Sequence, residues 1–302
     1  MTSIIIVNYI KYEDTIACVN SILKSNTSED YHIVVVDNAS DNDSWNRLQV
    51  LNKYPKITLI QSSENKGYCA GNNIGIKYSL ENIKSDYIWI LNPDTLVKED
   101  CLEKLHAFAA QQNNLGILGC KLVYYPDTQY LQAFGGGNFG ISKYGELRPK
   151  EHLYHLKPSD ELLPDVITMD LIIGASMYIP SSVFHNVGMM NENFFLYSDE
   201  NEFCLRILRA GLKNYAISSA VVFHKEGFRQ QNQSLLASYY CSRNALYLVR
   251  DLYPQNLKRN IQIFFIRTFM YFCRFKFKQA LYRIKAYRDF KKNIYGKVNL
   301  SI

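Results

Sequence analysis

Two hydrophobic patterns alternate along the first 125 residues of the chain. Short apolar runs typical of strands cover residues 3–8, 31–37, 56–60, 86–91 and 117–123. Between them, apolar residues with helical spacing cover the segments 13–24, 43–53, 69–82 and 99–112. This order predicts a βαβ series with a parallel sheet. Because the apolar runs are continuous, we expect both faces of that sheet to be buried.

The regular pattern stops at Tyr124 and returns near Val166. The segment between them is rich in Gly, Pro, Tyr and charged residues, which predicts a flexible or substrate-facing insertion. Ordered structure is expected again over 166–180, in a helix near 200–210, in a strand near 214–223 and in helices from 234 onward. The most apolar later stretch, 261–273, contains Arg267 and is shorter than the roughly 20 residues that span a bilayer, so no transmembrane helix is predicted.

Charge divides the chain into two parts. The formal net charge is +6, but residues 255–302 hold 12 Lys and Arg against one acid, Asp289, and the remaining residues carry a net charge of −5. We therefore predict a domain over 1–254, with a nucleotide-binding half (1–125) and an acceptor and catalytic half (126–254). A basic aromatic helical tail follows over 255–302. A chain of 302 residues with 47% hydrophobic positions is long and apolar enough for a sizeable core, which excludes a disordered protein.

The cysteines indicate a reducing environment. There are seven, an odd number, and none forms a CxxC pair, so neither a disulfide framework nor a zinc site is predicted. The first residues carry no basic segment before the apolar run that starts at Ile4, unlike a signal peptide. We expect a cytoplasmic protein.

Polar residues follow three of the predicted strands. Asn8, Asp37 and the pair Asn92 and Asp94 each stand where an apolar run ends. Ordinary turn chemistry explains any one of them alone. Since the carboxyl ends of parallel strands meet at one edge of a sheet, all three together favour a binding crevice at that edge.

A glycine-rich segment over 65–75 joins the third predicted strand to a helix. Its glycines allow backbone amides to approach an anionic group at the start of that helix. A GxGxxG pattern occurs at Gly135, Gly137 and Gly140, but neither a strand before it nor a helix after it is predicted. We therefore reject it as a dinucleotide site.

Taken in order, these segments resemble inverting glycosyltransferase family 2, and within it the rhamnosyltransferase-like branch. The segments that carry the resemblance are residues 4–9, 35–40, 65–75, 90–94, 174–176, 195–200 and 223–224. The resemblance covers about residues 1–250. It implies an α/β GT-A fold, with a Rossmann-like, mostly parallel sheet flanked by helices. To this fold the sequence adds the C-terminal helical basic extension. The resemblance also implies a nucleotide-diphosphate sugar donor and a divalent metal, Mg²⁺ or Mn²⁺.

The resemblance assigns roles to single residues. Asn8 and Asp37 are expected to contact the nucleoside, with Asp37 accepting a hydrogen bond from a pyrimidine base. The residues expected along the rest of the nucleotide sugar are Asn65, Gly67, Asn73 and Asn92.

The same resemblance places the metal at two residues. Asp94 matches the metal-binding acid of the DxD-type motif, whose first acid is here Asn92, so the metal meets one negative charge fewer. His224 ends an apolar strand and matches a second ligand of the metal or diphosphate. The alternative for His224 is a capped strand end.

A second acidic cluster begins the helix near residue 200. Asp199 is a good N-cap, and Glu202 either completes a capping box or pairs with Arg206 four residues on. Four residues before the apolar Cys204, Glu200 lies on the inward face, where a carboxylate has no inexpensive structural role. Glu200 also matches the catalytic base of the family. The family shows Glu before Asp more often, so Asp199 is the second choice.

The tail combines a basic stripe with aromatic residues. The stripe consists of Arg267, Arg274, Lys278, Lys285, Arg288 and Lys292. This pattern is typical of a helix that binds an anionic membrane surface, or of an arm that packs on its own body or on a second subunit. The acidic body argues against nucleic acid as a partner.

The resemblance, together with these patterns, implies a metal-dependent inverting glycosyltransferase. It would transfer one sugar, with rhamnose as one option, from a UDP- or dTDP-sugar to a lipid-linked saccharide acceptor of bacterial surface polysaccharide, O-antigen or capsule. The chain lacks the QxxRW motif of processive synthases, which favours single addition. We expect it at the inner face of the cell membrane, as a peripheral protein. The alternative is a catalytically silent saccharide-binding or membrane-scaffold protein.

Overall fold

The structure, a computed structural model, describes residues 1–150, 154–225 and 234–300. The α-helices are α1 Tyr12–Leu23, α2 Ser44–Leu48, α3 Tyr68–Tyr78, α4 Cys101–Ala109, α5 Ser181–Asn186, α6 Asp199–Arg209, α7 Leu235–Leu252, α8 Leu257–Cys273 and α9 Phe277–Lys291. The strands are β1 Thr2–Asn8, β2 Tyr31–Asp37, β3 Ile57–Gln61, β4 Tyr87–Leu91, β5 Thr95–Val97, β6 Leu115–Tyr124, β7 Leu131–Phe134, β8 Gly136–Gly137, β9 Phe139–Ile141, β10 Leu147–Pro149, β11 Val166–Met169, β12 Leu171–Ile172, β13 Ser176–Pro180 and β14 Lys213–His224. Short 3₁₀ or π turns extend or precede three helices: η1 Gln49–Lys53, η2 Ser79–Ile83 and η3 Pro254–Asn256.

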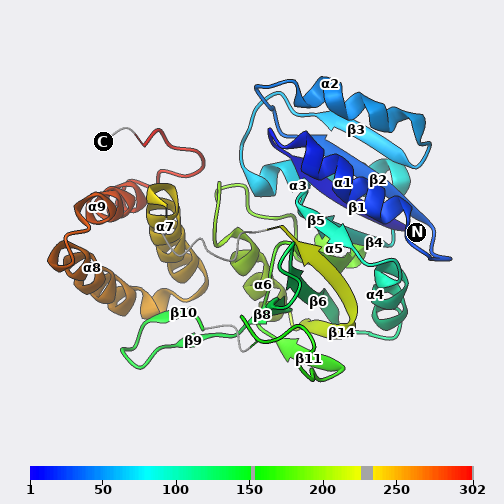
Figure 1. Cartoon of the computed structure of the whole chain (residues 1–302). Helices are drawn as coiled ribbons and strands as arrows, with labels where there is room; N and C mark the ends of the chain where they lie inside the picture. Colours follow the sequence, from blue (N-terminus) through cyan, green and yellow to red (C-terminus); the bar gives the residue numbers. More distant parts are fainter. Residues whose placement is uncertain (151–153, 226–233, 301–302) are drawn as a thin grey trace.

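A single large sheet organises the chain (Figure 1). Its strand order is β11-β14-β6-β13-β4-β1-β2-β3. The half from β4 to β3 is entirely parallel, as the alternation of strands and helices predicts. Antiparallel β13 separates β4 from β6, so β6 does not extend the parallel half directly.

Both faces of the sheet are covered. Along β1, Ile4 packs into a core with α1, α2 and α4, whereas its neighbour Ile5 packs into a core with α3, α5 and α6. Successive residues of a strand point to opposite faces, so a continuous apolar run serves both cores. The predicted α/β class with a mostly parallel, helix-flanked sheet is confirmed.

The insertion after β6 is more ordered than its sequence predicts. It contains the short strands β7 to β10, and β9 and β10 form an antiparallel hairpin. Their brevity hides the two-residue period of a strand. At Gly136, a Cβ atom would lie 2.1 Å from the Leu171 carbonyl oxygen, so glycine here permits close pairing of β8 with β12 and does not mark a loop.

The tail is helical, but it is not one continuous helix. The chain turns between α8 and α9 at Phe275, which has a φ of 56°, so the predicted stripe of six basic residues is divided between two helices. The prediction of one stripe is wrong because the left-handed turn at Phe275 leaves no trace in the spacing of basic residues.

The tail packs on the helix before it. α7 contacts both α8 and α9, and these three helices, called the helical group below, stand beside the sheet (Figure 1). The predicted boundary at residue 254 falls between α7 and α8, which pack on each other, so the division of the chain there stays a prediction. Among the residues that the structure describes, no helix is long and apolar enough to cross a membrane.

Candidate active site

The first two strands end in a buried polar network. Asn8 and Asp37 pair across β1 and β2, and both side chains are fully buried. Asn8 donates to Asp37 (Nδ2 to Oδ1, 2.7 Å), as does the Ser40 hydroxyl (2.7 Å), while Thr15 donates to Asn8 Oδ1 (2.7 Å). Asn8 thus holds the Asp37 carboxylate in place. Contact of either residue with a nucleoside stays a prediction.

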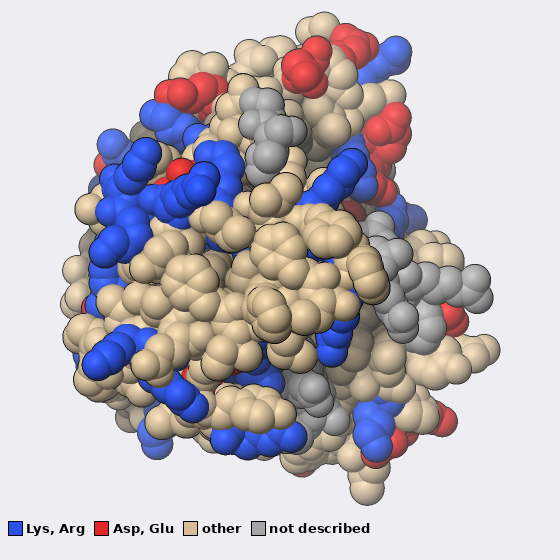
Figure 2. All heavy atoms as spheres, turned by 90° about the vertical axis from the view of Figure 1, so that its left-hand side faces the viewer, with Lys and Arg blue, Asp and Glu red and all other residues tan. Residues whose placement is uncertain are grey.

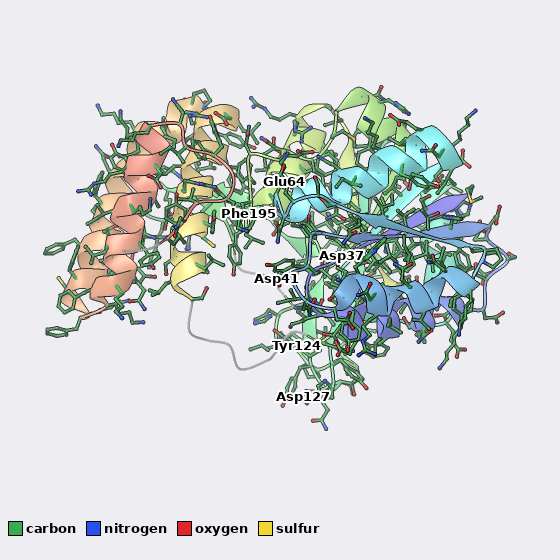
Figure 3. All side chains as sticks on the ribbon, turned by 90° about the horizontal axis from the view of Figure 1, so that it is seen from above. Asp37, Asp41, Glu64, Tyr124, Asp127 and Phe195 are labelled. Carbon is green, nitrogen blue, oxygen red and sulfur yellow. The ribbon has the colours of Figure 1, made fainter. Side chains whose placement is uncertain are left out.

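The sheet edge that carries this network faces the helical group. Seen from above, Asp37 at the end of β2, Tyr124 at the end of β6 and Phe195 before α6 lie on that side of the sheet (Figure 3). The carboxyl ends of the strands meet there, which is where ligands bind in this type of sheet.

The glycine-rich segment folds back on residue 195. The Asn65 side chain accepts hydrogen bonds from the Gly67 amide (2.9 Å) and from Asn38 Nδ2 (3.1 Å). Gly67 has a φ of +102°, and a Cβ atom on it would lie 2.2 Å from the Phe195 carbonyl oxygen. Only glycine fits there, because both the backbone conformation and the space exclude a side chain.

Asn73 points to a different partner. Its Nδ2 donates to the Met190 carbonyl (2.9 Å) and to Glu192 Oε1 (2.9 Å), and its Oδ1 accepts from the Met190 amide (3.2 Å). These bonds fasten α3 to the segment before α6. A place for Asn73 along the donor stays a prediction.

Five of the predicted site residues line one cleft of about 360 Å³. They come from the end of β4, from the start of α6 and from the end of β14. These residues are Asn92, Asp94, Asp199, Glu200 and His224. Residues more than one hundred positions apart thus converge at the predicted edge of the sheet.

Asp94 and His224 form a pair in this cleft. His224 Nε2 lies 3.1 Å from Asp94 Oδ1, and its Nδ1 lies 2.8 Å from Gln132 Oε1. Burial would raise the pKa of Asp94, but the hydrogen bond and charge of His224 outweigh it and hold the pKa below its ordinary value. The described residues contain no group of three or more His, Cys, Asp and Glu arranged for a metal.

A strained turn presents the second pair of carboxyl groups. Tyr197 and Ser198 have φ values of 67° and 63°, a conformation that residues other than glycine rarely adopt. Ser198 occupies the N-cap position, so the prediction of Asp199 as N-cap is wrong. Asp199 is instead the first residue of α6, only 3% exposed, and accepts a hydrogen bond from the Cys69 thiol (3.6 Å). The left-handed turn places it one position further into the helix.

Glu202 and Glu200 differ in their surroundings. Glu202 pairs with Arg206 (Oε1 to Nε, 3.0 Å), which confirms the predicted ion pair. Burial raises the pKa of Glu200 well above its usual range, and the charge and hydrogen bond of Asp199 raise it further. Such a shift beside a cleft is typical of a group that exchanges protons during a reaction.

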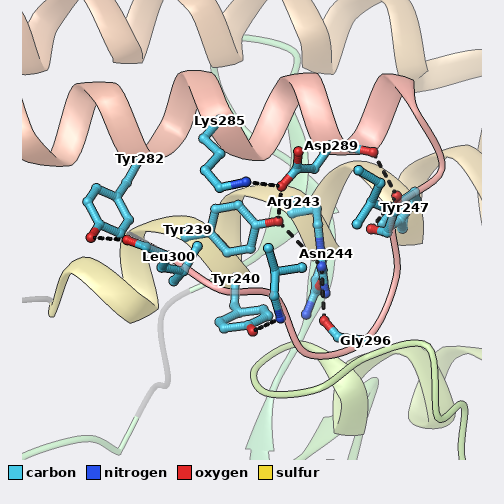
Figure 4. Close-up of polar contacts among 12 residues, drawn as sticks. Tyr239, Tyr240, Arg243, Asn244, Tyr247, Tyr282, Lys285, Asp289, Gly296 and Leu300 are labelled. Carbon is cyan, nitrogen blue, oxygen red and sulfur yellow. Dashed lines mark hydrogen bonds and ion pairs between the residues drawn. The ribbon is translucent and has the colours of Figure 1, made fainter. Parts of the chain in front are cut away.

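Sequence reasoning gave no role to Arg243 and Asn244, and the structure supplies one. Asn244 Nδ2 donates to the carbonyls of Leu196 and Tyr197, both at 2.9 Å. Arg243 donates from Nε to Asn244 Oδ1 (3.1 Å) and from Nη1 to the Gly296 carbonyl (3.0 Å), as Figure 4 shows. Arg243 thereby fixes the orientation of the Asn244 amide, and Asn244 holds the turn that precedes Asp199.

Comparisons with known proteins identify the family. The model "Glycosyl transferase family 2" matches residues 3–154, and "Glycosyl transferase family group 2" matches residues 87–275. A low-salt glycan biosynthesis hexosyltransferase of Haloferax volcanii is 30% identical over 261 residues, which is 85% of this chain and 78% of the relative. This chain belongs to glycosyltransferase family 2. The predicted family and the predicted enzyme class, glycosyltransferase, are confirmed.

Two further comparisons agree with this family. A dTDP-rhamnosyl transferase of Shigella flexneri is 26% identical to this family 2 glycosyltransferase over 258 residues, or 83% of the chain and 81% of the relative. Among solved structures, GalNAc-T7 with UDP, GalNAc and Mn²⁺ superposes with a TM-score of 0.61 at 14% identity. It matches 83% of this chain, which spans about half (47%) of that structure. This likeness confirms the GT-A-like fold.

Proposed function

We propose that this family 2 glycosyltransferase transfers one sugar, with inversion at the anomeric carbon, from a UDP- or dTDP-sugar to a lipid-linked saccharide of bacterial surface glycan. The observation that carries the proposal is the cleft in which Asp94 and His224 face the carboxyl groups of α6. The names of the relatives support a nucleotide-sugar donor, since one is a dTDP-rhamnosyl transferase and a structural neighbour holds UDP.

Glu200 is the proposed catalytic base. As a carboxylate, it would take the proton from the attacking hydroxyl of the acceptor. Its raised pKa makes it a better proton acceptor than an ordinary glutamate. Asp199 is committed to a bond from Cys69 and lies deeper, so its part is to raise the basicity of Glu200. Asp199 as the base is the alternative.

Asp94 and His224 are the proposed metal ligands. A carboxylate oxygen and an imidazole nitrogen suit Mn²⁺, and a single carboxylate with the donor phosphates suits Mg²⁺. When bound, the ion would offset the negative charge on the departing diphosphate. Asn92, beside this pair, is proposed to contact the donor.

A thermal-shift panel of UDP- and dTDP-sugars, each with Mn²⁺ and with EDTA, tests the donor and the metal. We expect one donor to raise the melting temperature with Mn²⁺ and not with EDTA. The same shift in EDTA would refute the metal, and no shift with any donor would favour the silent saccharide-binding alternative.

An apolar surface on the helical group suggests how the enzyme reaches a lipid-linked acceptor. Figure 2 shows a broad uncharged area on the side where α8 and α9 lie, bordered by Lys and Arg. Its exposed apolar residues, called the α8–α9 face below, are Phe265, Ile266, Phe269, Met270, Phe275, Phe277 and Leu281. Apolar side chains inside a basic border suit the interface of an anionic membrane. We propose that this face holds the enzyme peripherally on the inner surface of the cell membrane.

Vesicle flotation with phosphatidylglycerol tests the membrane contact. Phe269 and Phe275 are 67% and 81% exposed, so F269E with F275E adds two negative charges to the face without disturbing a core. We expect this variant to lose flotation and V50E, on exposed η1, to keep it. Equal flotation of both variants would refute the proposal, and dimerisation through the face in light scattering would indicate a second subunit as its partner.

A further inference from the structure

A second cavity, of about 460 Å³, adjoins the cleft. Its walls come from α6 and α7, from the β9–β10 hairpin and from the tail helices α8 and α9. Tyr197 and Glu200 line both hollows, so the proposed base lies where they meet. Nothing in the assignment of donor, metal or base explains this cavity.

The cavity contains more positive than negative charge. Arg267 pairs with Glu146 (Nη2 to Oε2, 2.6 Å), and Arg148 approaches the same carboxylate oxygen at 3.7 Å. Arg283 donates only to neutral groups, chiefly the hydroxyls of Thr268 (3.0 Å) and Ser242 (2.8 Å). Within residues 1–150, 154–225 and 234–300, no carboxylate lies within ion-pair distance of Arg283. Among the described residues, Glu146 thus pairs with two guanidinium groups, while Arg283 has no carboxylate at ion-pair distance and feels the charge of Glu146 only from further away.

The surrounding side chains fix Arg283 at the wall of the cavity. Burial lowers the pKa of its guanidinium, which shows that this charge is costly where it stands. Phe264 and Tyr271 stack on it at 4.5 and 5.5 Å and fix its plane. Each terminal nitrogen of the guanidinium has a second proton beyond the one donated to Ser242 or to the Phe264 carbonyl, so Arg283 can still donate charge-assisted hydrogen bonds to an oxyanion in the cavity.

An apolar groove continues from this cavity. The groove has a volume of about 510 Å³ and shares Arg267 and Tyr271 with the cavity. Its walls include Ile263, Ile266 and Met270 of α8. Ile266 and Met270 also belong to the α8–α9 face, so the groove leads from the arginines to the proposed membrane surface.

The cleft, the arginine cavity and the apolar groove adjoin one another in that order, and each has a different chemical character. From the cleft, Glu200 leads into the arginine cavity, and Arg267 leads from there into the apolar groove. We infer that the cavity binds the diphosphate of the acceptor through Arg148, Arg267 and Arg283, and that the groove receives the first part of an isoprenoid chain. This inference rests on the proposed lipid-linked acceptor and gives it a site separate from the donor's phosphates. The saccharide that the diphosphate carries then extends toward Glu200.

Calorimetry with farnesyl diphosphate tests the site without any sugar transfer. Farnesyl diphosphate, inorganic pyrophosphate and farnesol are each titrated into the chain of residues 1–302, once without UDP and once with the chain saturated with UDP. We expect farnesyl diphosphate to bind more tightly than either fragment and to keep its affinity in UDP. Displacement by UDP would place it in the donor cleft and overturn the inference. Equal affinity for pyrophosphate would overturn the lipid part.

Three variants locate the binding. R283Q should raise the Kd of farnesyl diphosphate about tenfold, the loss expected for a charge-assisted bond. R148Q, whose side chain is 47% exposed, should raise it several-fold. R288Q is the matched control, because Arg288 is exposed on the same helix as Arg283 and lines none of the three hollows. If R283Q does not fold, R148Q decides; equal Kd values for R148Q and R288Q would overturn the inference.

Sugar transfer is measured separately. If the chain transfers no sugar but binds farnesyl diphosphate in a way that depends on the arginines, the proposed function is refuted and this site stays in place. Sugar transfer by the chain, with a farnesyl diphosphate affinity that does not depend on the arginines, would refute this site and leave the proposed function in place.

Discussion

Asn244 offers a sharp test of how this enzyme positions its carboxyl groups. N244A removes the two hydrogen bonds from Nδ2 to the Leu196 and Tyr197 carbonyls, which hold the turn, and also the bond that Asn244 Oδ1 accepts from Arg243 Nε. It substitutes no residue of the cleft, because Asn244 does not line it. The variant therefore separates the holding of the turn from contact with a substrate.

The expected magnitude follows from the turn that Asn244 holds. Each lost hydrogen bond lowers the free energy of unfolding by about 1 kcal/mol, or about 2 kcal/mol for the two that hold the turn. The left-handed Tyr197 and Ser198 each store roughly 1–3 kcal/mol of backbone strain. The two bonds therefore offset much of that strain, and without them the turn should relax. If the competent conformation becomes about 1.4 kcal/mol less favourable, kcat falls about tenfold.

The assay compares N244A with S238A. Ser238 is buried on the same helix, and within the described residues its hydroxyl has no hydrogen-bond partner, so its truncation controls for a polar deletion in α7. Nucleoside diphosphate release gives kcat, donor titration gives the Kd, and urea unfolding gives the stability. We expect N244A to lose about 3 kcal/mol of stability, since three hydrogen bonds are lost in all, and at least tenfold in kcat while its donor Kd stays within twofold of the wild type. Unchanged kcat in a destabilised N244A would show that the turn does not position the carboxyl groups, and the reasoning would fail.

Four further outcomes follow from the site. E200Q should abolish transfer and keep donor binding, with E103Q, at an exposed position of α4, as control; unchanged turnover would remove Glu200 as the base. Because the folded state raises the pKa of Glu200, transfer in the wild type should increase with pH through that raised value. Stability should fall as the pH rises from the ordinary pKa of a glutamate to the raised one, because over that interval the unfolded chain has lost the proton that the folded chain still holds. A pH series of urea melts should show this fall in the wild type and not in E200Q. D94A should lose Mn²⁺-dependent donor binding in calorimetry, and equal affinity with and without metal would contradict its role as a ligand. G67A should cost about 2 kcal/mol or more in a urea melt, since its Cβ meets the Phe195 carbonyl; wild-type stability would show that the segment moves freely.

The sequence was most informative where local chemistry determines position. Parallel strands place their carboxyl ends at one edge whatever the packing around them, so the pattern alone located Asn8, Asp37 and Asp94 at that edge, while their roles stay predictions. The pattern did not indicate the position of His224, and the resemblance was needed to find it. His224 ends β14, which lies at the far side of the sheet.

Contacts between distant segments were beyond sequence reasoning. Asn244 bonds to residues 47 and 48 positions away, and no periodicity reports such a pair. Tyr197 and Ser198 adopt a left-handed conformation although neither is glycine, so no sign of the turn appears in the sequence. The predicted N-cap, Asp199, was therefore one residue too late. A strained turn at the start of α6 is the kind of local inconsistency that sequence rules miss at functional sites.

The positive charge of the tail has three separate uses, which a count of charges cannot show. Arg259 bonds to the Tyr144 carbonyl through Nε and Nη2 (3.0 and 2.6 Å) and, with Arg267 on Glu146, fastens the β9–β10 hairpin to α8. Arg267 and Arg283 point into the cavity beside Glu200, and exposed Lys and Arg border the α8–α9 face. The hairpin and the tail therefore build one wall together, although sequence analysis treated them as unrelated. The helices that are proposed to contact the lipid thus also line the cavity beside Glu200, and in the proposed arrangement they shape the route by which the saccharide reaches the base.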